Sequence, residues 1–239
     1  MIIFYSYLIL FLLYFFLFFS FKLLVKKFNL YDSPSDRKIH TIPIPYIGGA
    51  IIFSLINILI FFRDYPFELN YLIYTSSIVF IIGLLDDKFN LNPLVRLFTQ
   101  FCSSVIILGA GILITNLGNF YFIGNLELYY FSYIITIFCI IISINSFNFI
   151  DGIDGLCSGV FISGIFLIIL FNSYFNTYSY INFVFLYDIS FIVSCFFITN
   201  YFFKKQKIFL GDSGSNLLGF FLSVILIYYT QSMEPAFHP

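Results

Sequence analysis

Charged residues are scarce in this chain of 239 residues, at only 10%, and tryptophan is absent altogether. Hydrophobic residues make up 61% of the chain, and its mean hydropathy is +1.00. This apolar content exceeds what a soluble domain needs for its core, so the composition predicts an integral membrane protein that lies in the lipid bilayer. The net charge of −1 offers no electrostatic basis for binding nucleic acid.

Cysteine is also rare, and its placement predicts no disulfide framework or thiolate metal site. The four cysteines are scattered in or beside apolar runs: Cys102, Cys139, Cys157 and Cys195. Aromatic residues are plentiful instead, with 37 Phe and 19 Tyr. We interpret them as a compositional bias, because scattered apolar surface needs no functional explanation.

Eight apolar runs predict an all-α polytopic membrane protein with about eight transmembrane helices. The runs are Met1–Phe21, Ile47–Phe62, Tyr71–Leu85, Leu94–Leu117, Tyr129–Ile144, Leu156–Tyr174, Tyr180–Phe203 and Ser215–Tyr229. Between the fourth and fifth runs, the alternating segment Asn119–Leu128 contains a Gly-Asn pair that favours a small hairpin on the outer side.

The distribution of positive charge predicts the orientation of these helices. If the N-terminus lies outside, ten of the eleven Lys and Arg residues fall in cytoplasmic loops, and only Arg63 falls outside. Cytoplasmic loops of membrane proteins carry such an excess of Lys and Arg. The first run has its positive charges after the apolar core rather than before it, which argues against a signal peptide.

Polar residues gather on the same predicted cytoplasmic side in four clusters. These are Ser33–Gly49, Asp86–Arg96, Asn145–Gly159 and Lys204–Gly214. The outer loops hold few polar residues by comparison. We therefore predict one reaction centre, facing the cytoplasm and built from loops that are far apart in the sequence.

The third cluster, NSFNFIDGIDGLCSG, organises the prediction, because a polar residue recurs at every third position. These residues are Asn145, Asn148, Asp151 and Asp154. On a helix this spacing keeps them near one face, and in a loop the glycines after the aspartates allow tight turns. Polar groups at the end of a membrane helix are costly and usually functional.

Each aspartate of the other clusters, taken alone, fits a structural role as well as a functional one. Asp86 and Asp87 close one apolar run, where acids are often just solvated. Asp212 opens the last run, where it could be an N-cap. Together, however, the carboxylates suit Mg²⁺, which takes one or two protein oxygens plus substrate phosphate and water, and basic groups would neutralise the remaining charge. The residues alone thus predict a Mg²⁺-dependent enzyme acting on a phosphorylated substrate.

The motifs also resemble a known family. DSPSDRKIHTIPIPYIGG, LLDDKFN with Arg96 and Gln100, NSFNFIDGIDGL and FLGDSGSNLLG, which together run from Asp32 to Gly219, are similar to motifs of the polyprenyl-phosphate N-acetylhexosamine-1-phosphate transferases of glycosyl transferase family 4. The similarity is greatest to the bacterial branch that uses UDP-GlcNAc and undecaprenyl phosphate. It implies transfer of a sugar-1-phosphate from a UDP-N-acetylhexosamine to undecaprenyl phosphate, with release of UMP.

The resemblance also implies roles for single residues. Asp212 resembles the main Mg²⁺ ligand, with Asn148 as a second ligand and Mn²⁺ as an alternative metal. Asp86 and Asp87 resemble the catalytic pair that positions or deprotonates the lipid phosphate. The remaining matches resemble substrate-binding positions, for the nucleotide or for phosphate: Lys38, His40, Asn90, Arg96, Asn145, Asp151, Asp154 and Gly211.

By the same resemblance, residues 1–239 form a single transmembrane catalytic domain of a multi-pass protein of the bacterial plasma (inner) membrane. Family members continue through at least two further helices and a loop rich in His and Arg, so we expect that this chain lacks them. An inactive fragment is therefore one alternative. A transporter is another, and it would depend on Asp188 inside the seventh run. A homodimer is left open.

Overall fold

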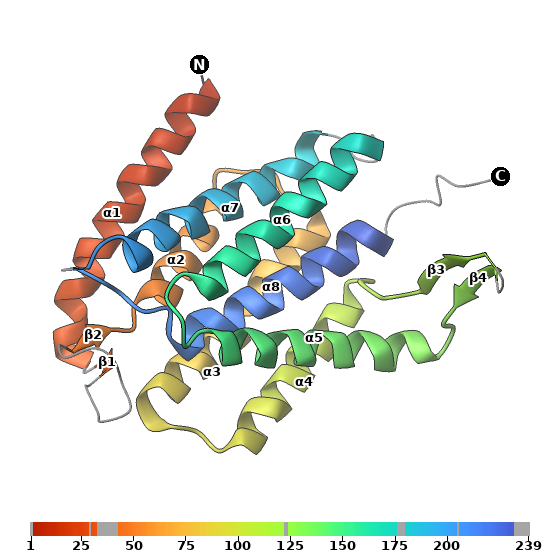
Figure 1. Cartoon of the computed structure of the whole chain (residues 1–239), viewed down its shortest axis with the longest axis horizontal. Coiled ribbons are helices and arrows are strands. Elements are labelled where there is room, and N and C mark those ends of the chain that lie inside the picture. Colours follow the sequence, from red (N-terminus) through yellow and green to blue (C-terminus); the bar gives the residue numbers. More distant parts are fainter. Residues whose placement is uncertain are drawn as a thin grey trace.

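A computed structural model describes residues 2–28, 30–32, 43–121, 124–175, 180–204 and 206–231. These residues hold eight helices and two short antiparallel hairpins (Figure 1). The helices are α1 (Ile2–Phe28), α2 (Gly48–Ile60), α3 (Phe67–Phe89), α4 (Pro93–Gly109), α5 (Phe131–Ile150), α6 (Leu156–Phe175), α7 (Tyr180–Tyr201) and α8 (Gly211–Gln231). The strands are β1 (Tyr31–Asp32), paired with β2 (Ile44–Pro45), and β3 (Asn116–Phe120), paired with β4 (Gly124–Glu127).

Six of these helices are long and apolar enough to cross a membrane, namely α1, α3, α5, α6, α7 and α8. The other two are shorter, because α2 has 13 residues and α4 has 17. A bilayer core of about 30 Å needs about 20 helical residues. The multi-pass architecture is thus confirmed, while the count of eight spans and their orientation stay predictions.

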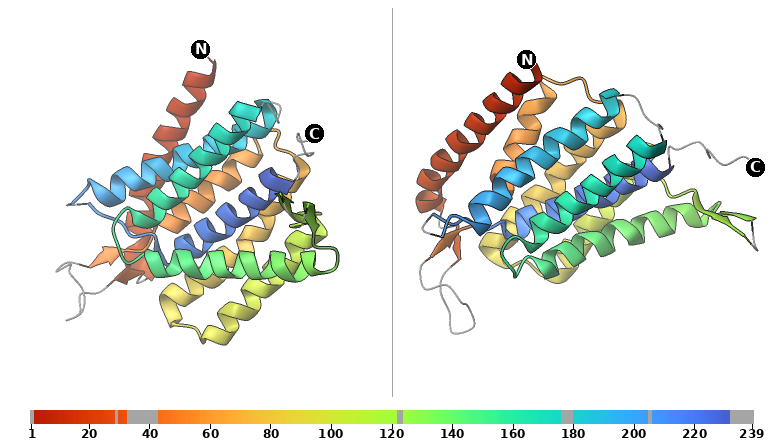
Figure 2. Two further views of the ribbon diagram at one scale, coloured as in Figure 1. Left: turned by 45° about the vertical axis from the view of Figure 1, so that its right-hand side comes forward. Right: turned by 45° about the horizontal axis from the view of Figure 1, so that its top comes forward.

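Helix α8 lies at the centre of the bundle (Figure 2). Every residue of α8 from Ser213 to Ile225 is buried, and α2, α3, α5 and α6 all pack against this helix. Helix α7 packs against α6, and α1 packs against α2 and α7. Because α8 is surrounded by other helices, its polar N-terminus is reached from several of them at once.

Small residues allow the close packing around α8. A Cβ atom placed on Gly83 of α3 would lie 2.4 Å from Cα of Ser213, and one placed on Gly219 of α8 would lie 2.8 Å from Cα of Ile144. Neither distance is compatible with a side chain. Small residues at such crossings let backbones approach, which is a common way to pack helices in membranes.

The prediction of one helix over Leu94–Leu117 is wrong in its C-terminal part. Helix α4 ends at Gly109, and Gly111 follows with a φ of +78°. A glycine in this left-handed conformation is a common helix terminator, although the apolar run continues past it. The N–H of Ile114 then donates to the hydroxyl of Thr136 on α5, at 2.9 Å.

The hairpin predicted over Asn119–Leu128 is present, but it starts earlier. Strand β3 begins at Asn116, and Phe120 pairs with Gly124. The Gly-Asn pair of the sequence therefore begins β4 and does not form the turn. Gln231 at the end of α8 holds the hairpin, because its Oε1 accepts from the N–H of Thr115, at 2.8 Å, and from that of Asn116, at 3.2 Å.

Asp188, the ionisable residue inside α7, is paired rather than open to a pathway. Its Oδ2 accepts from the hydroxyl of Tyr65 at 2.8 Å and lies 3.2 Å from Nε of Arg63. The Asp188 side chain is 1% exposed. The one basic residue predicted to lie outside thus neutralises the one acid within this helix, which removes the reason for a transporter interpretation.

Candidate functional site

Asp87, at the end of α3, caps the N-terminus of α8. Its carboxylate accepts hydrogen bonds from the backbone N–H groups of Asp212, at 2.7 Å, and Ser213, at 3.1 Å. The first N–H groups of a helix have no partner within the helix, and a negative charge there is stabilised by the helix dipole. Gly211 precedes them with a φ of +74°, and a Cβ there would lie 2.8 Å from the Asp87 carboxylate. Glycine at this position therefore makes the cap sterically accessible.

Asp86, the other member of the acidic pair, points to different partners. Its Oδ2 accepts from Nη1 of Arg96 at 2.7 Å, and its Oδ1 accepts from the N–H of Leu91 at 2.8 Å. Asn90 ends α3 in the left-handed conformation, with a φ of +49°, and its N–H donates to the Asp86 carbonyl. The turn between α3 and α4 thus brings the Arg96 side chain into contact with Asp86.

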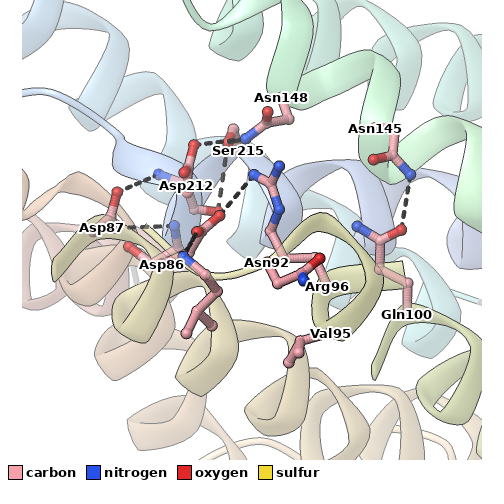
Figure 3. Close-up of polar contacts among 12 residues, drawn as sticks. Asp86, Asp87, Asn92, Val95, Arg96, Gln100, Asn145, Asn148, Asp212 and Ser215 are labelled. Carbon is pink, nitrogen blue, oxygen red and sulfur yellow. Dashed lines mark hydrogen bonds and ion pairs between the residues drawn. The ribbon is translucent and has the colours of Figure 1, made fainter. Parts of the chain in front are cut away.

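Asn148 on α5 joins the same group of residues (Figure 3). Its Nδ2 donates to Oδ1 of Asp212, at 2.6 Å, and to the hydroxyl of Ser215, at 3.3 Å. Asp86 is also close enough to Asp212 for the two carboxylates to interact. We call Asp86, Asp87, Arg96, Asn148 and Asp212 the acidic centre. It draws on α3, α4, α5 and α8.

Asn145 lies one helical turn before Asn148 and pairs with Gln100 of α4. Its Nδ2 donates both to Oε1 of Gln100, at 2.7 Å, and to the backbone carbonyl of Ile141, at 2.8 Å. Gln100 is buried, at 5% exposure. Asn145 and Asn148, one step apart in the three-residue repeat, therefore belong to two neighbouring groups of residues.

The end of the same motif makes a turn between α5 and α6. Asp154 forms an ion pair with Lys207, and the N–H of Gly155 donates to Oδ1 of Asn200 at 2.8 Å. Asn200 also donates to the carbonyl of Ile208, at 2.8 Å. These contacts tie the Asp151–Gly155 turn to the segment that leads into α8. Asp154 is thus directed to Lys207 rather than to the acidic centre.

Asp151 lies at the start of this turn, and the charges of the acidic centre affect its pKa. Burial raises the pKa of Asp151 well above its usual range, and the charges of Asp212, Asp87 and Asp154 raise it further. Like charges disfavour the ionised form of a neighbouring carboxyl group. Among the described residues, Asp87, Asp212 and Asp154 therefore lie close enough to Asp151 to repel its negative charge.

The structure brings half of the predicted site residues together in or beside the acidic centre. Asp86, Asp87, Asn148 and Asp212 meet directly, with Arg96 and Gly211 beside them. Asn90 is exposed. Its role in the structure comes from its backbone, which ends α3 in the left-handed conformation, and not from a side-chain contact with the acidic centre. Lys38 and His40 lie outside the described residues.

Four residues of this region were not named as site residues in the sequence-based prediction: Gln100, Asn200, Lys207 and Ser215. Gln100 was among the residues that match the family motifs, but it had no assigned role. Asn200 is a single amide near the end of an apolar run, and such a residue only weakly indicates a buried hydrogen bond. Lys207 and Ser215 lie in a cluster already marked as polar. Their partners follow only from how the helices pack.

A bundle of apolar helices that carries carboxylate, amide and guanidinium groups at one end belongs to the class of multi-pass membrane proteins with a polar site at one end of the bundle. The profile of glycosyl transferase family 4 matches residues 69–230. This range includes every residue of the acidic centre. The chain belongs to glycosyl transferase family 4.

Several curated proteins are similar over most of the chain. An undecaprenyl-phosphate alpha-N-acetylglucosaminyl 1-phosphate transferase of Yersinia pestis is 32% identical over 94% of this chain and 62% of its own length. The protein of that name in Escherichia coli K12 is 32% identical, over 94% and 61%. A probable undecaprenyl-phosphate N-acetylglucosaminyl 1-phosphate transferase of Bacillus subtilis is 28% identical, over 85% and 56%. The chain thus spans about three fifths of the length of these relatives.

Proposed function

We propose that this protein transfers a sugar-1-phosphate, with GlcNAc-1-phosphate as the first choice, from a UDP-N-acetylhexosamine to undecaprenyl phosphate. The products are undecaprenyl-diphospho-sugar and UMP. The observation that carries the proposal is the acidic centre itself, where Asp87, Asp212 and Asn148 are joined by hydrogen bonds and Arg96 lies beside them. The names of the relatives supply the substrate class.

The donor set of the acidic centre fits Mg²⁺. Asn148 uses its Nδ2 for Asp212 and Ser215, which leaves its carbonyl Oδ1 as a hard oxygen ligand beside the Asp212 carboxylate. Mg²⁺ prefers such oxygens and usually keeps positions for substrate phosphate and water. Asp212 and Asn148 would hold the ion. When bound, it would neutralise negative charge on the phosphates of the donor substrate.

Asp86 and Asp87, at the end of α3, already accept hydrogen bonds from the protein, which favours a role in positioning other groups over nucleophilic attack. Both oxygens of Asp87 accept backbone N–H groups, and Asp86 accepts from Arg96 and Leu91. A phosphate monoester has its second pKa near about 6, so the acceptor is mostly dianionic at neutral pH and needs no strong base. We therefore favour direct attack by an acceptor phosphate oxygen on the β-phosphorus of the UDP-sugar, with UMP as the leaving group, over an aspartyl-phosphate intermediate.

The protein's own groups have separate tasks in this scheme. Arg96, fixed by Asp86, offers its other guanidinium donors to phosphate oxygens. Asp87 holds the start of α8, and hence Asp212, in place. We place this chemistry on the cytoplasmic side of the bacterial inner membrane, because the Lys and Arg residues and the site share one predicted side.

A radiolabel assay in membranes tests the proposal. UDP-[¹⁴C]GlcNAc and undecaprenyl phosphate are supplied with Mg²⁺ or with EDTA, to the wild-type chain and to Asp212→Ala. We expect label in the organic phase only with Mg²⁺ and intact Asp212. No transfer by the chain, with GlcNAc or with another UDP-N-acetylhexosamine, would mean that it is inactive by itself. Undiminished transfer in EDTA would contradict the proposed requirement for Mg²⁺.

A further inference from the structure

The amide pair Gln100–Asn145 has a defined orientation. The carbonyl of Ile141 can only accept hydrogen bonds, so the Asn145 atom that faces it, at 2.8 Å, is the amino group Nδ2. The same Nδ2 lies 2.7 Å from Gln100, so the Gln100 atom at that contact is the carbonyl Oε1. The Nε2 donor of Gln100 therefore faces away from Asn145.

The Nε2 of Gln100 makes no hydrogen bond among the residues that the structure describes. Gln100 is 5% exposed, and its side-chain hydrogen bond with Asn145 uses Oε1. Figure 3 shows its amino group on the side toward Arg96, away from the contact with Asn145. A donor held in this position, with no acceptor among the described residues, is available to an oxygen of a ligand.

Arg96 and Gln100 lie on one face of α4, because they are four residues apart. Arg96 uses Nη1 for Asp86, and its Nε and Nη2 make no hydrogen bond within the described part of the chain. The guanidinium and the Gln100 amide thus present a row of N–H donors without an acceptor between them. Such a row suits the oxygens of a phosphate group.

The opposite face of α4 indicates which phosphate this is. It is an exposed apolar stripe at helical spacing: Leu94 71%, Phe98 67%, Phe101 46% and Val105 43%. The inner face holds Gln100, Ser103 and Ile107, all buried. A helix with this pattern lies at the edge of the bundle against lipid. A phosphate attached to a prenyl chain reaches the inner face of α4 while its tail stays in the membrane.

We propose that Gln100, oriented by Asn145, is a phosphate-binding residue that together with Arg96 holds the phosphate of the polyprenyl acceptor. The proposal rests on the proposed function for the identity of the acceptor. The competing source of the same chemistry is the diphosphate of the UDP-sugar. The two are separated by measuring the affinity for each substrate on its own.

Gln100→Glu is the discriminating variant. The new side chain keeps an oxygen for Asn145 Nδ2, replaces the free donor by an oxygen and adds a negative charge. The contact with Asn145 thus survives the change, and the separate UDP-GlcNAc measurement reports the general effect of the charge on anion binding. At pH 8, binding of undecaprenyl phosphate and of UDP-GlcNAc is measured separately on the purified chain. We expect the dissociation constant for undecaprenyl phosphate to rise about tenfold or more, while that for UDP-GlcNAc changes less than about twofold.

Two further variants guard the interpretation. Gln206→Glu makes the same chemical change on an exposed glutamine and should leave both affinities unchanged. Asn145→Asp removes the amino group that orients Gln100, so Gln100 turns its Nε2 to the new carboxylate and the polyprenyl affinity falls as in Gln100→Glu. Thermal unfolding of each variant in detergent shows whether the fold is kept.

The outcomes separate this inference from the proposed function. Unchanged affinity of Gln100→Glu for undecaprenyl phosphate, in a chain that transfers sugar phosphate, overturns the inference and leaves the function standing. A selective loss of UDP-GlcNAc affinity assigns Gln100 to the donor diphosphate and also overturns it. A wild-type chain that binds neither substrate overturns both proposals.

Discussion

The carboxylate of Asp87 accepts the backbone N–H of Asp212 at 2.7 Å, although the two residues are 125 positions apart. Through this contact the end of α3 fixes the start of α8, which carries the residue that we assign to the metal. A charge-assisted hydrogen bond at a helix N-terminus is among the stronger polar contacts in proteins. The geometry of the acidic centre therefore depends on Asp87 even if Asp87 never touches substrate.

Asp87→Ala should lower both stability and transfer activity. It leaves two backbone N–H groups of α8 without an acceptor, which costs about 2–4 kcal/mol. For a chain of this size that corresponds to a fall in Tm of about 5–15 °C in detergent. Lys88→Ala, at the exposed neighbouring position, is the control and should unfold like the wild type. Equal Tm values for Asp87→Ala and the wild type would contradict the capping role.

Gly83→Ala should disturb the packing of α3 against α8. The added Cβ would lie 2.4 Å from Cα of Ser213, so the two helices must separate and the Asp87 cap must lengthen. We expect a loss of about 1–3 kcal/mol in the free energy of unfolding. Gly109→Ala is the matched control, because its nearest neighbouring atom is 3.6 Å away. Thermal unfolding and the radiolabel assay should separate the two variants.

Mg²⁺ should stabilise the wild-type chain against heat. A ligand that binds only the folded state adds about 2.7 kcal/mol at a concentration of 100 times its Kd, and EDTA should remove this gain. Asp212→Asn should lose most of the response, because it removes the carboxylate that we assign to the ion. The same rise in Tm for Asp212→Asn and the wild type would place the ion elsewhere.

Arg63→Ala should destabilise the end of the bundle away from the acidic centre. It leaves Asp188, whose side chain is 1% exposed, without its cation. Breaking a buried pair costs about 3–5 kcal/mol, and we expect about 2 kcal/mol here because Arg63 is 27% exposed. Arg63→Ala combined with Asp188→Asn should recover part of the loss. Asp64→Ala, at the exposed next position, is the control.

Asp151→Asn should stabilise the protein in a pH-dependent way. The pKa of Asp151 is raised in the folded state, so its ionisation costs stability as the pH rises from about 4 through the folded pKa. The variant avoids this cost, and its Tm should exceed that of the wild type at pH 8 in EDTA. The difference should vanish near pH 4. A difference that stays constant with pH would contradict the raised pKa of Asp151, which burial and then the charges of Asp212 and Asp87 cause.

Much of the site was predictable from composition and spacing. The apolar runs predict the helices because a bilayer demands about 20 apolar residues per span. Asp86, Asp87, Asn148 and Asp212 stand out because polar residues beside such runs are costly. The family follows from the same motifs, since the match covers residues 69–230 and includes all four.

The helix ends were less predictable where apolar residues continue beyond them. Residues Leu94–Leu117 read as one run, but Gly111 with its positive φ ends α4 soon after Gly109. A conformation of this kind depends on what the following segment contacts, here Thr136 for Ile114. Hydrophobicity alone does not record that contact.

The sequence by itself determined that this chain forms apolar helices with polar ends, and which polar residues are candidates for chemistry. Only the tertiary structure decided which of them meet: Asp87 with the start of α8, Asn145 with Gln100, and Asp154 with Lys207. The physical reason is that helical periodicity sets which residues share a face of one helix. Which helix lies opposite that face is set by close packing between segments far apart in the chain, as where Gly83 meets Ser213.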